Sequence, residues 1–314
     1  MKLIIQIPCY NEAGTLPLVL ADIPARIPGI DKIETMVIDD GSTDETVVVA
    51  KKLHVDHIIP LNFNHGLGRA FQAGIDHALS QGADIVVNTD GDNQYHSADI
   101  EKLVAPIINK QAQIVIGDRQ TDQIQHFSWL KKILQKIGSR TVAYLAGIDI
   151  SDAVSGFRAY SRSALININV TSDFSYVLDT IIQAGQKRIK IISVPIATNP
   201  PTRPSRLFGN IFEHVYKSTA NLIRVYIFYE PLKTFSFIGS IFCLIGLFPM
   251  IRFLYYYFHA AGEGHIQSLI AGAMFIVIGI QMFGLSIVGI LFQKQNRLTE
   301  EILSQIKKDK YDKP

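Results

Sequence analysis

Short apolar runs alternate with amphipathic stretches from Met1 to about Arg206. Runs rich in β-branched residues, separated by stretches with helical spacing, predict strands joined by helices and hence a mostly parallel α/β sheet. Ser42 and Glu45 have the spacing of a capping box before a helix that ends near Leu53. Further helices are predicted over 15–26, 66–80, 97–109, 127–146 and 176–186, and strands over 3–7, 33–38, 57–61, 83–87, 113–119 and 188–196.

One predicted strand ends in two carboxylates. The apolar run 85–87 is followed by Asp90 and Asp92, with Gln94 two residues further on. Open α/β sheets bind ligands outside the carboxyl ends of their strands, and Mg²⁺ or Mn²⁺ is held by oxygen ligands from carboxylates and substrate phosphates. The alternative is a simple polar turn, so the meaning of this stretch depends on the rest of the chain.

Two long apolar stretches follow the predicted sheet domain. Residues 234–251 and 266–292 carry no formal charge, and each is long enough to cross a bilayer core, which takes about 20 helical residues. A pair of buried helices in a soluble protein is the alternative. Basic residues flank the two outer ends of this hairpin, whereas 259–265 has no Lys or Arg, so the positive-inside rule places the sheet domain in the cytoplasm. The flanking residues are Lys233, Lys294, Arg297, Lys307, Lys308 and Lys310.

The stretch between the sheet domain and the hairpin is amphipathic. Its apolar positions oppose Glu213, Lys217 and Arg224, which predicts helices at the membrane interface. Packing of the same apolar face on the sheet domain is an alternative that does not exclude the first. We therefore expect an α/β sheet domain over 1–205, interface helices over 206–232, a transmembrane hairpin over 233–292 and a basic cytoplasmic tail over 293–314.

Composition limits the remaining function classes. The chain has 314 residues, a formal net charge of +2 and only two cysteines. No disulfide framework is therefore expected, and this is consistent with a reducing compartment. The basic stretch 127–140 lacks interleaved stacking aromatics, so we expect no nucleic-acid partner. Glycines in the apolar stretches permit close helix contacts, which leaves a homo-oligomer open.

Five motifs occur in a fixed order. They are Pro8-Cys9-Tyr10-Asn11-Glu12, Asp39-Asp40-Gly41-Ser42-Thr43-Asp44, Asn64-His65-Gly66-Leu67-Gly68-Arg69-Ala70, Asp90-Gly91-Asp92-Asn93-Gln94 and Ser155-Gly156-Phe157-Arg158. In this order the motifs resemble a family-2 glycosyltransferase with the GT-A fold, a Rossmann-like and mostly parallel α/β domain. With the apolar pair that follows, the chain is similar to the polyprenyl-phosphate glycosyltransferases, the group that includes dolichyl-phosphate mannose synthases. The resemblance extends to about Phe292.

The resemblance implies a role for each motif. The nucleoside of a UDP- or GDP-linked sugar would be held by Pro8, Tyr10, Glu12 and Asp40. Mg²⁺ or Mn²⁺ on the donor diphosphate would be held by Asp90, Asp92 and Gln94, and would act as a Lewis acid when the bond to the leaving diphosphate breaks. Arg119 and Arg158 are candidates for binding phosphates, because guanidinium groups match phosphate oxygens; an ordinary salt-bridging role is the alternative.

The acceptor is expected to be polyprenyl phosphate (undecaprenyl or dolichyl) in a lipid bilayer. A lipid monophosphate is already anionic at pH 7, so it can attack the sugar without much help from a base. Asp152 matches the acid that precedes the last motif in the family, and would orient the acceptor or act as base. Arg203, Ser205 and Arg206 stand where related enzymes have a basic loop near the membrane, and would bind the acceptor phosphate.

The sequence therefore predicts an inverting glycosyltransferase of the inner (plasma) membrane, multi-pass, with its catalytic domain in the cytoplasm. Its expected catalytic residues are Asp92, Asp152 and Arg158. Two alternatives stay open at this point: transfer to another membrane acceptor, such as diacylglycerol or a lipid-linked saccharide, and a membrane protein that only binds nucleotide sugars or recruits partners.

Overall fold

The computed structural model describes residues 1–120, 129–148, 150–170, 176–200, 220, 223–224, 226–259 and 265–311, with the backbone alone for 129–135. The chain divides into two compact units, one of Met1–Ile211 with Glu300–Pro314 and the other of Phe212–Thr299. The predicted acceptor-phosphate residues Arg203, Ser205 and Arg206 lie outside the described residues, as does most of 206–232.

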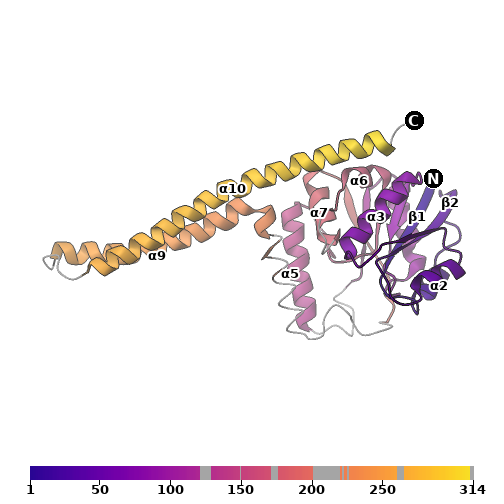
Figure 1. Cartoon of the computed structure of the whole chain (residues 1–314), viewed down its shortest axis with the longest axis horizontal. Coiled ribbons are helices and arrows are strands. Elements are labelled where there is room, and N and C mark those ends of the chain that lie inside the picture. Colours follow the sequence, from indigo (N-terminus) through magenta and orange to yellow (C-terminus); the bar gives the residue numbers. More distant parts are fainter. Residues whose placement is uncertain are drawn as a thin grey trace. The chain divides into compact units, whose positions relative to one another are not determined.

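A seven-stranded sheet forms the centre of the first unit, in the order β3-β2-β1-β4-β6-β5-β7. Its strands β1 and β2 are labelled in Figure 1. Within the sheet, β6 is antiparallel to β4 and β5, and the other pairings are parallel. The mostly parallel sheet is therefore confirmed. Its strands are β1 Lys2–Cys9, β2 Lys32–Asp39, β3 His57–Pro60, β4 Ile85–Asn88, β5 Ile114–Asp118, β6 Arg158–Ser161 and β7 Ile191–Pro195.

Helices cover both faces of this sheet, which explains why the central strands are continuously apolar. On one face Leu3, Ile5 and Ile7 pack into a core cluster that includes residues of α1 and α4. On the other face α3 lies so close to β1 that a Cβ at Gly74 would stand 2.5 Å from Gln6 Oε1. The helices are α1 Leu16–Ala21, α2 Thr46–Lys52, α3 Leu67–Ser80, α4 Ile100–Ile108, α5 Trp129–Ala146, α6 Arg162–Asn167 and α7 Tyr176–Gln186, with a 3-10 turn η1 Ser97–Asp99.

The structure corrects the predicted start of α2. Ser42 does not cap this helix, because its Oγ accepts a hydrogen bond from Asn11 N (2.8 Å) across the sheet edge. The helix begins at Thr46, after an N-cap residue, Glu45, whose side chain makes no capping hydrogen bond. Ser42 therefore connects the loop after β2 to the loop after β1, and it does not cap a helix.

The second unit contains α9 Pro231–His259 and the first part of α10 Ile266–Tyr311, which confirms two long apolar helices. The most apolar windows of the two helices have mean hydropathy values of 2.1 and 2.4, and only 11% of each window is buried, so both are candidate membrane spans. The helices approach closely at glycines. A Cβ at Gly246 would stand 2.7 Å from Gly272 O, and one at Gly239 would stand 2.9 Å from Gly279 O.

The end of α10 differs from the predicted basic tail. The helix continues to Tyr311, and residues 300–311 count with the first unit. There Lys307 Nζ donates to Ile168 O (3.0 Å), Asn169 Nδ2 donates to Ser304 Oγ (3.4 Å), and Glu300 pairs with Lys187 (3.3 Å). These contacts make the end of the chain part of the sheet domain.

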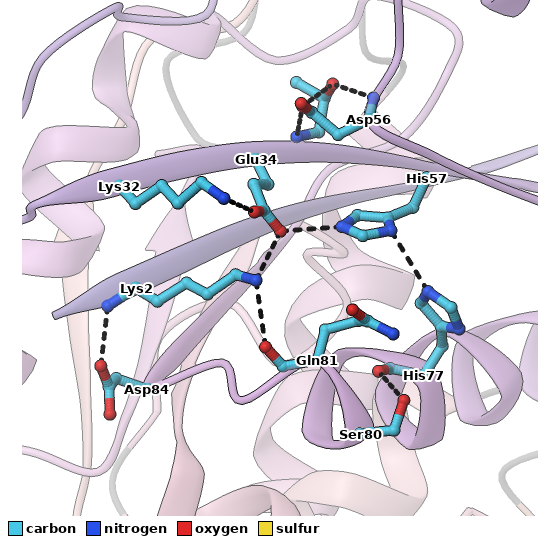
Figure 2. A network of polar contacts seen from close by, with 10 residues as sticks. Lys2, Lys32, Glu34, Asp56, His57, His77, Ser80, Gln81 and Asp84 are labelled. Atoms are coloured by element: carbon cyan, nitrogen blue, oxygen red, sulfur yellow. Dashed lines mark hydrogen bonds and ion pairs between the residues drawn. The ribbon is translucent and has the colours of Figure 1, made fainter.

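A polar network at the amino ends of β1, β2 and β3 surrounds one buried carboxylate (Figure 2). Glu34, whose side chain is 7% exposed, accepts from Lys2 Nζ (2.7 Å), Lys32 Nζ (2.6 Å) and His57 Nε2 (2.8 Å). Burial alone would raise the pKa of Glu34, but the hydrogen bonds from these three groups outweigh it and lower the pKa to about 2.

Replacing Glu34 by Gln tests this network. Because the pKa of the folded state is lowered, the stabilisation is complete above the ordinary value of 4.5 and is lost as the pH falls through about 2. We expect Glu34→Gln to lower the free energy of unfolding by about 1–2 kcal/mol at pH 7, and by much less near pH 2. Thermal unfolding at both pH values measures the change in stability, and Glu101→Gln, at an exposed position, is the control. A pH-independent difference would contradict the assignment.

The glycine contacts of the hairpin predict a second outcome. Gly246→Leu places a side chain where Gly272 O and Ile276 lie, whereas Gly284→Leu adds a Cβ that has no neighbouring heavy atom within 4 Å. The first variant should separate α9 from α10 and lower the thermal stability of the purified protein, and the second should leave it near wild type. Cysteine cross-linking between the two helices in each variant distinguishes a separated hairpin from a general loss of folding.

Candidate active site

Loops from neighbouring strands meet at the carboxyl edge of the sheet. Glu12 N donates to Thr46 Oγ1 (2.9 Å), which joins the loop after β1 to the start of α2. Thr15 Oγ1 lies within hydrogen-bond distance of Gly91 O (2.7 Å) and of Glu12 Oε2 (2.8 Å), which joins the same loop to the turn after β4. The three polar strand ends found in the sequence therefore form one edge, as predicted.

The predicted nucleoside-binding residues differ in accessibility. Tyr10 is 42% exposed, whereas Glu12, Asp40 and Pro8, the last residue but one of β1, are buried. The carboxylate of Asp40 already accepts from His65 N (2.8 Å) and Gly66 N (3.0 Å). Asp40 thus shapes the loop after β3, and any contact it makes with a ligand uses its remaining lone pairs.

That loop carries an exposed aromatic residue that the sequence analysis missed. The ring of Phe63 is 62% exposed and lies 3.8 Å from the ring of His65, measured between centroids. Phe63 follows β3, two strands away from Tyr10 at the end of β1. Phe63 belongs to none of the five motifs, and a phenylalanine in a loop has no distinctive spacing that would indicate a role.

The carboxylates after β4 are crowded with negative charge. Burial, and next the charge of Asp92, raise the pKa of Asp90 to about 7, and Glu12 adds to the effect. Gln94 Nε2 donates to Asp92 Oδ2 (2.7 Å), so the third predicted ligand lies beside the second. A site that raises the proton affinity of a carboxylate in this way is chemically suited to a divalent cation.

The donor set fits a cation that shares its ligands with a substrate. Among the residues that the structure describes, no group of three His, Cys, Asp or Glu side chains is placed to hold a metal ion by itself. Mg²⁺ and Mn²⁺ often take only one or two carboxylates from a protein and complete their shell with phosphate oxygens and water. Asp90, Asp92 and Gln94 match that arrangement.

A buried hydrogen-bond network supports Asp90 from behind. Asn88, at the end of β4, donates to Tyr176 Oη (2.8 Å) and Gly156 O (3.0 Å) and accepts from Gln6 Nε2 (2.9 Å). A Cβ at Gly156 would stand 3.0 Å from Asp90 Oδ2 and 2.8 Å from Tyr176 Oη. The carboxylate therefore lies against the backbone of the turn before β6, where only glycine leaves room.

Arg119 and Asp152 are paired with each other. Arg119 donates from Nε to Asp152 Oδ2 (2.7 Å) and from Nη2 to Asp152 Oδ1 (2.9 Å), and both side chains are largely buried. Burial alone would raise the pKa of Asp152, but the hydrogen bonds and charge of Arg119 lower it. A carboxylate held in this way is a weak base, so the structure favours an orienting role for Asp152 over proton abstraction.

Arg158 is placed differently from its prediction. Its side chain is fully buried, and its guanidinium donates to the backbone oxygens of Ser155 (2.7 Å), Val177 (2.8 Å) and Ala153 (2.9 Å) and to Thr180 Oγ1 (2.8 Å). These bonds occupy its nitrogens and anchor the last motif to α7. Direct phosphate binding by Arg158 is therefore corrected to a structural role, that of holding the turn that contacts Asp90.

Comparison with known proteins agrees with this geometry. The family model described as glycosyl transferase family 2 matches residues 4–168, which is more than half of the chain. The chain belongs to this family. The match ends before α7, so of the residues described above it leaves out Tyr176, Val177 and Thr180.

Two relatives show how far the similarity extends. A polyprenol monophosphomannose synthase of Mycolicibacterium smegmatis is 27% identical over 229 residues, 69% of this chain and 85% of the relative. An undecaprenyl-phosphate 4-deoxy-4-formamido-L-arabinose transferase of Sodalis glossinidius is 28% identical over 304 residues, 92% of this chain and 87% of the relative. The second alignment is long enough to include the apolar helices.

A solved structure supports the fold. Glucosyl-3-phosphoglycerate synthase of Mycobacterium tuberculosis, crystallised with Mn²⁺, UDP and glucosyl-3-phosphoglycerate, superposes with a TM-score of 0.53 over 73% of this chain and 79% of its own, at 19% identity. At that identity the likeness bears on the fold alone, and it confirms the expected GT-A class.

Substitution of Gly156 tests the support behind Asp90. Gly156→Ala should displace the Asp90 carboxylate or Tyr176, because both lie within 3.0 Å of the added carbon. A displacement of about 1 Å at a reacting centre can reduce the rate about 100-fold, so we expect a loss of about 10- to 100-fold and a higher requirement for Mn²⁺. Glycosyl transfer measured over a range of Mn²⁺ concentrations gives both quantities.

Gly14→Ala is the matched control, because a Cβ at Gly14 meets nothing within 4 Å. Unchanged Mn²⁺ dependence in Gly156→Ala, with normal thermal stability, would show that this contact does not position Asp90.

Proposed function

We propose that this glycosyltransferase moves a sugar from a nucleoside-diphosphate sugar to polyprenyl phosphate at a membrane surface. One combination carries the proposal: a crowded carboxylate pair at the sheet edge of a family 2 domain, in a chain with two helices long enough to cross a bilayer. The two relatives described above are named for transfer to polyprenyl carriers, and the proposal extends that acceptor to this chain.

The donor would bind across the ends of β1, β2 and β4. Tyr10 and Phe63 offer exposed rings for the base, and the buried Pro8, Glu12 and Asp40 are proposed to complete the nucleoside site. Asp90, Asp92 and Gln94 would hold Mg²⁺ or Mn²⁺ against the diphosphate. When bound, that ion neutralises the charge that develops on the leaving nucleoside diphosphate.

The acceptor phosphate supplies the nucleophile. One of its oxygens forms the new bond to C1 of the sugar while the bond from C1 to the diphosphate oxygen breaks, and the nucleoside diphosphate leaves. Because Asp152 is held by Arg119 at a lowered pKa, it orients the acceptor rather than taking a proton. A single displacement inverts the anomeric centre. Arg203, Ser205 and Arg206 are proposed to bind the acceptor phosphate.

The remaining assignments rest on the sequence pattern. The basic residues at the outer ends of the hairpin support a proposal of two spans in the inner (plasma) membrane, with the catalytic domain on the cytoplasmic side. UDP-linked and GDP-linked sugars are both compatible with Glu12 and Asp40, because either nucleoside can donate hydrogen bonds to carboxylates. The two polyprenyl-carrier relatives carry different sugars in their names, so the sugar is left to experiment.

Transfer of radiolabel into extractable lipid tests the proposal. Purified protein is incubated with a panel of UDP- and GDP-sugars, polyprenyl phosphate, and Mn²⁺ or Mg²⁺. We expect a mild-acid-labile lipid product of inverted configuration, which requires the metal and is reduced at least about 100-fold in Asp92→Asn. The matched control is Asp22→Asn, at an exposed position after α1.

Two results would contradict the proposal. Labelling of diacylglycerol or of a lipid-linked saccharide, but not of polyprenyl phosphate, would assign a different acceptor to the same site. Full function of Asp92→Asn in cells would indicate a protein that binds nucleotide sugars without transferring them.

A further inference from the structure

Two histidines face each other at the edge of the sheet opposite to the carboxylates. His57 is the first residue of β3, and His77 lies in the last turn of α3. Their nearest ring nitrogens, His57 Nδ1 and His77 Nε2, are 3.3 Å apart, and the rings meet at 66° with centroids 5.1 Å apart (Figure 2). Nothing in the proposed transfer reaction uses this pair.

Glu34 fixes the orientation and tautomer of His57. The Glu34 carboxylate is 2.8 Å from His57 Nε2 and also accepts from Lys2 and Lys32, so it is ionised and His57 Nε2 carries the proton. In the neutral ring the other nitrogen, Nδ1, then has a free lone pair, and that lone pair points toward His77. Metal sites often have this arrangement: one ring nitrogen of a ligating histidine donates to a carboxylate, and the other ring nitrogen binds the metal.

The separation of the two nitrogens suits a metal better than a hydrogen bond. At 3.3 Å it exceeds the usual range for hydrogen bonds from N–H groups, about 2.7–3.2 Å. Two nitrogens at about 2.0–2.1 Å from a tetrahedral Zn²⁺ are about 3.3 Å apart, because the tetrahedral angle fixes that distance. The rings therefore need little movement to bind one ion between them.

The charges around the pair are compatible with a bound dication. Glu34 offsets part of the positive charge of Lys2 and Lys32 on the far side of His57.

We propose that His57 and His77 bind a divalent ion of borderline softness, Zn²⁺ above all, with Glu34 as the group that orients His57. No group of three His, Cys, Asp or Glu side chains is assembled among the described residues, so water would complete the coordination shell. Imidazole ligands favour Zn²⁺, Cu²⁺ and Ni²⁺, whereas the oxygen ligands of the opposite edge favour Mg²⁺ and Mn²⁺. The two sites are thereby separated by chemistry as well as by the length of the strands.

The consequence of binding would be structural. His57 belongs to the edge strand β3, and His77 to the helix that packs on β1 and β2. An ion held by both would connect β3 to α3, and any ligand that binds only the folded state raises its stability. Because the carboxyl edge is not involved, glycosyl transfer should continue with Zn²⁺ bound here.

Calorimetric titration of the full-length protein with Zn²⁺, in excess Mg²⁺ and UDP, tests the proposal. Wild type should bind one more ion than His57→Gln or His77→Gln, and the ion should raise the thermal unfolding temperature of wild type alone. Glu34→Gln should weaken binding by about 10-fold or more, since groups that orient a ligand typically contribute that much. His54→Gln, an exposed histidine near β3, is the matched control and should behave as wild type.

Cu²⁺ as a spectroscopic probe identifies the ligands directly. Nitrogen hyperfine structure in the electron paramagnetic resonance spectrum should report two imidazoles in wild type and one in either single variant. Equal Zn²⁺ stoichiometry in wild type and both variants, or no binding by wild type, would overturn the proposal. Neither result bears on glycosyl transfer, which is assayed separately.

Discussion

The site depends on one costly placement, a carboxylate that lies against the backbone in a largely buried position beside a second carboxylate. Asp90 touches the turn at Gly156, and its pKa is raised because burial and Asp92 both disfavour its charge. Such a position stores unfavourable electrostatic energy until a cation or a proton arrives. The polypeptide around it must therefore be rigid enough to hold the carboxylate where it is.

That rigidity comes from polar groups that never reach a substrate. Asn88 joins β4 to Tyr176 and Gly156, and Arg158 ties the same turn to α7 with bonds to four different residues. Buried polar groups stabilise a unique arrangement only when their partners are present, so these residues specify one geometry for the turn. The Ser-Gly-Phe-Arg motif thus shapes the surroundings of Asp90, with its glycine as the contact and its arginine as the anchor.

The two edges of the sheet show how one architecture separates two kinds of chemistry. Parallel strands bring carboxylates and loop amides together at the carboxyl edge. The same strands bring Lys2, Lys32, Glu34 and His57 together at the amino edge, where they form a compensated network of opposite charges (Figure 2). Neighbouring carboxylates of like charge mark the edge where the reaction is proposed, and paired opposite charges mark the edge that contributes to stability.

The sequence by itself determined the features that depend on neighbours along the chain. Periodicity predicted the strands and α7, apolar length predicted α9 and the start of α10, and the spacing of Asp90, Asp92 and Gln94 indicated a cation site. Only the tertiary structure decided the roles that depend on distant partners. It showed that Ser42 bonds to Asn11, that Arg119 is committed to Asp152, that Arg158 is buried, and that His57 faces His77. The sequence determines the chemistry of each side chain. Folding determines its partners, which raise its pKa, occupy its donors or share its lone pairs.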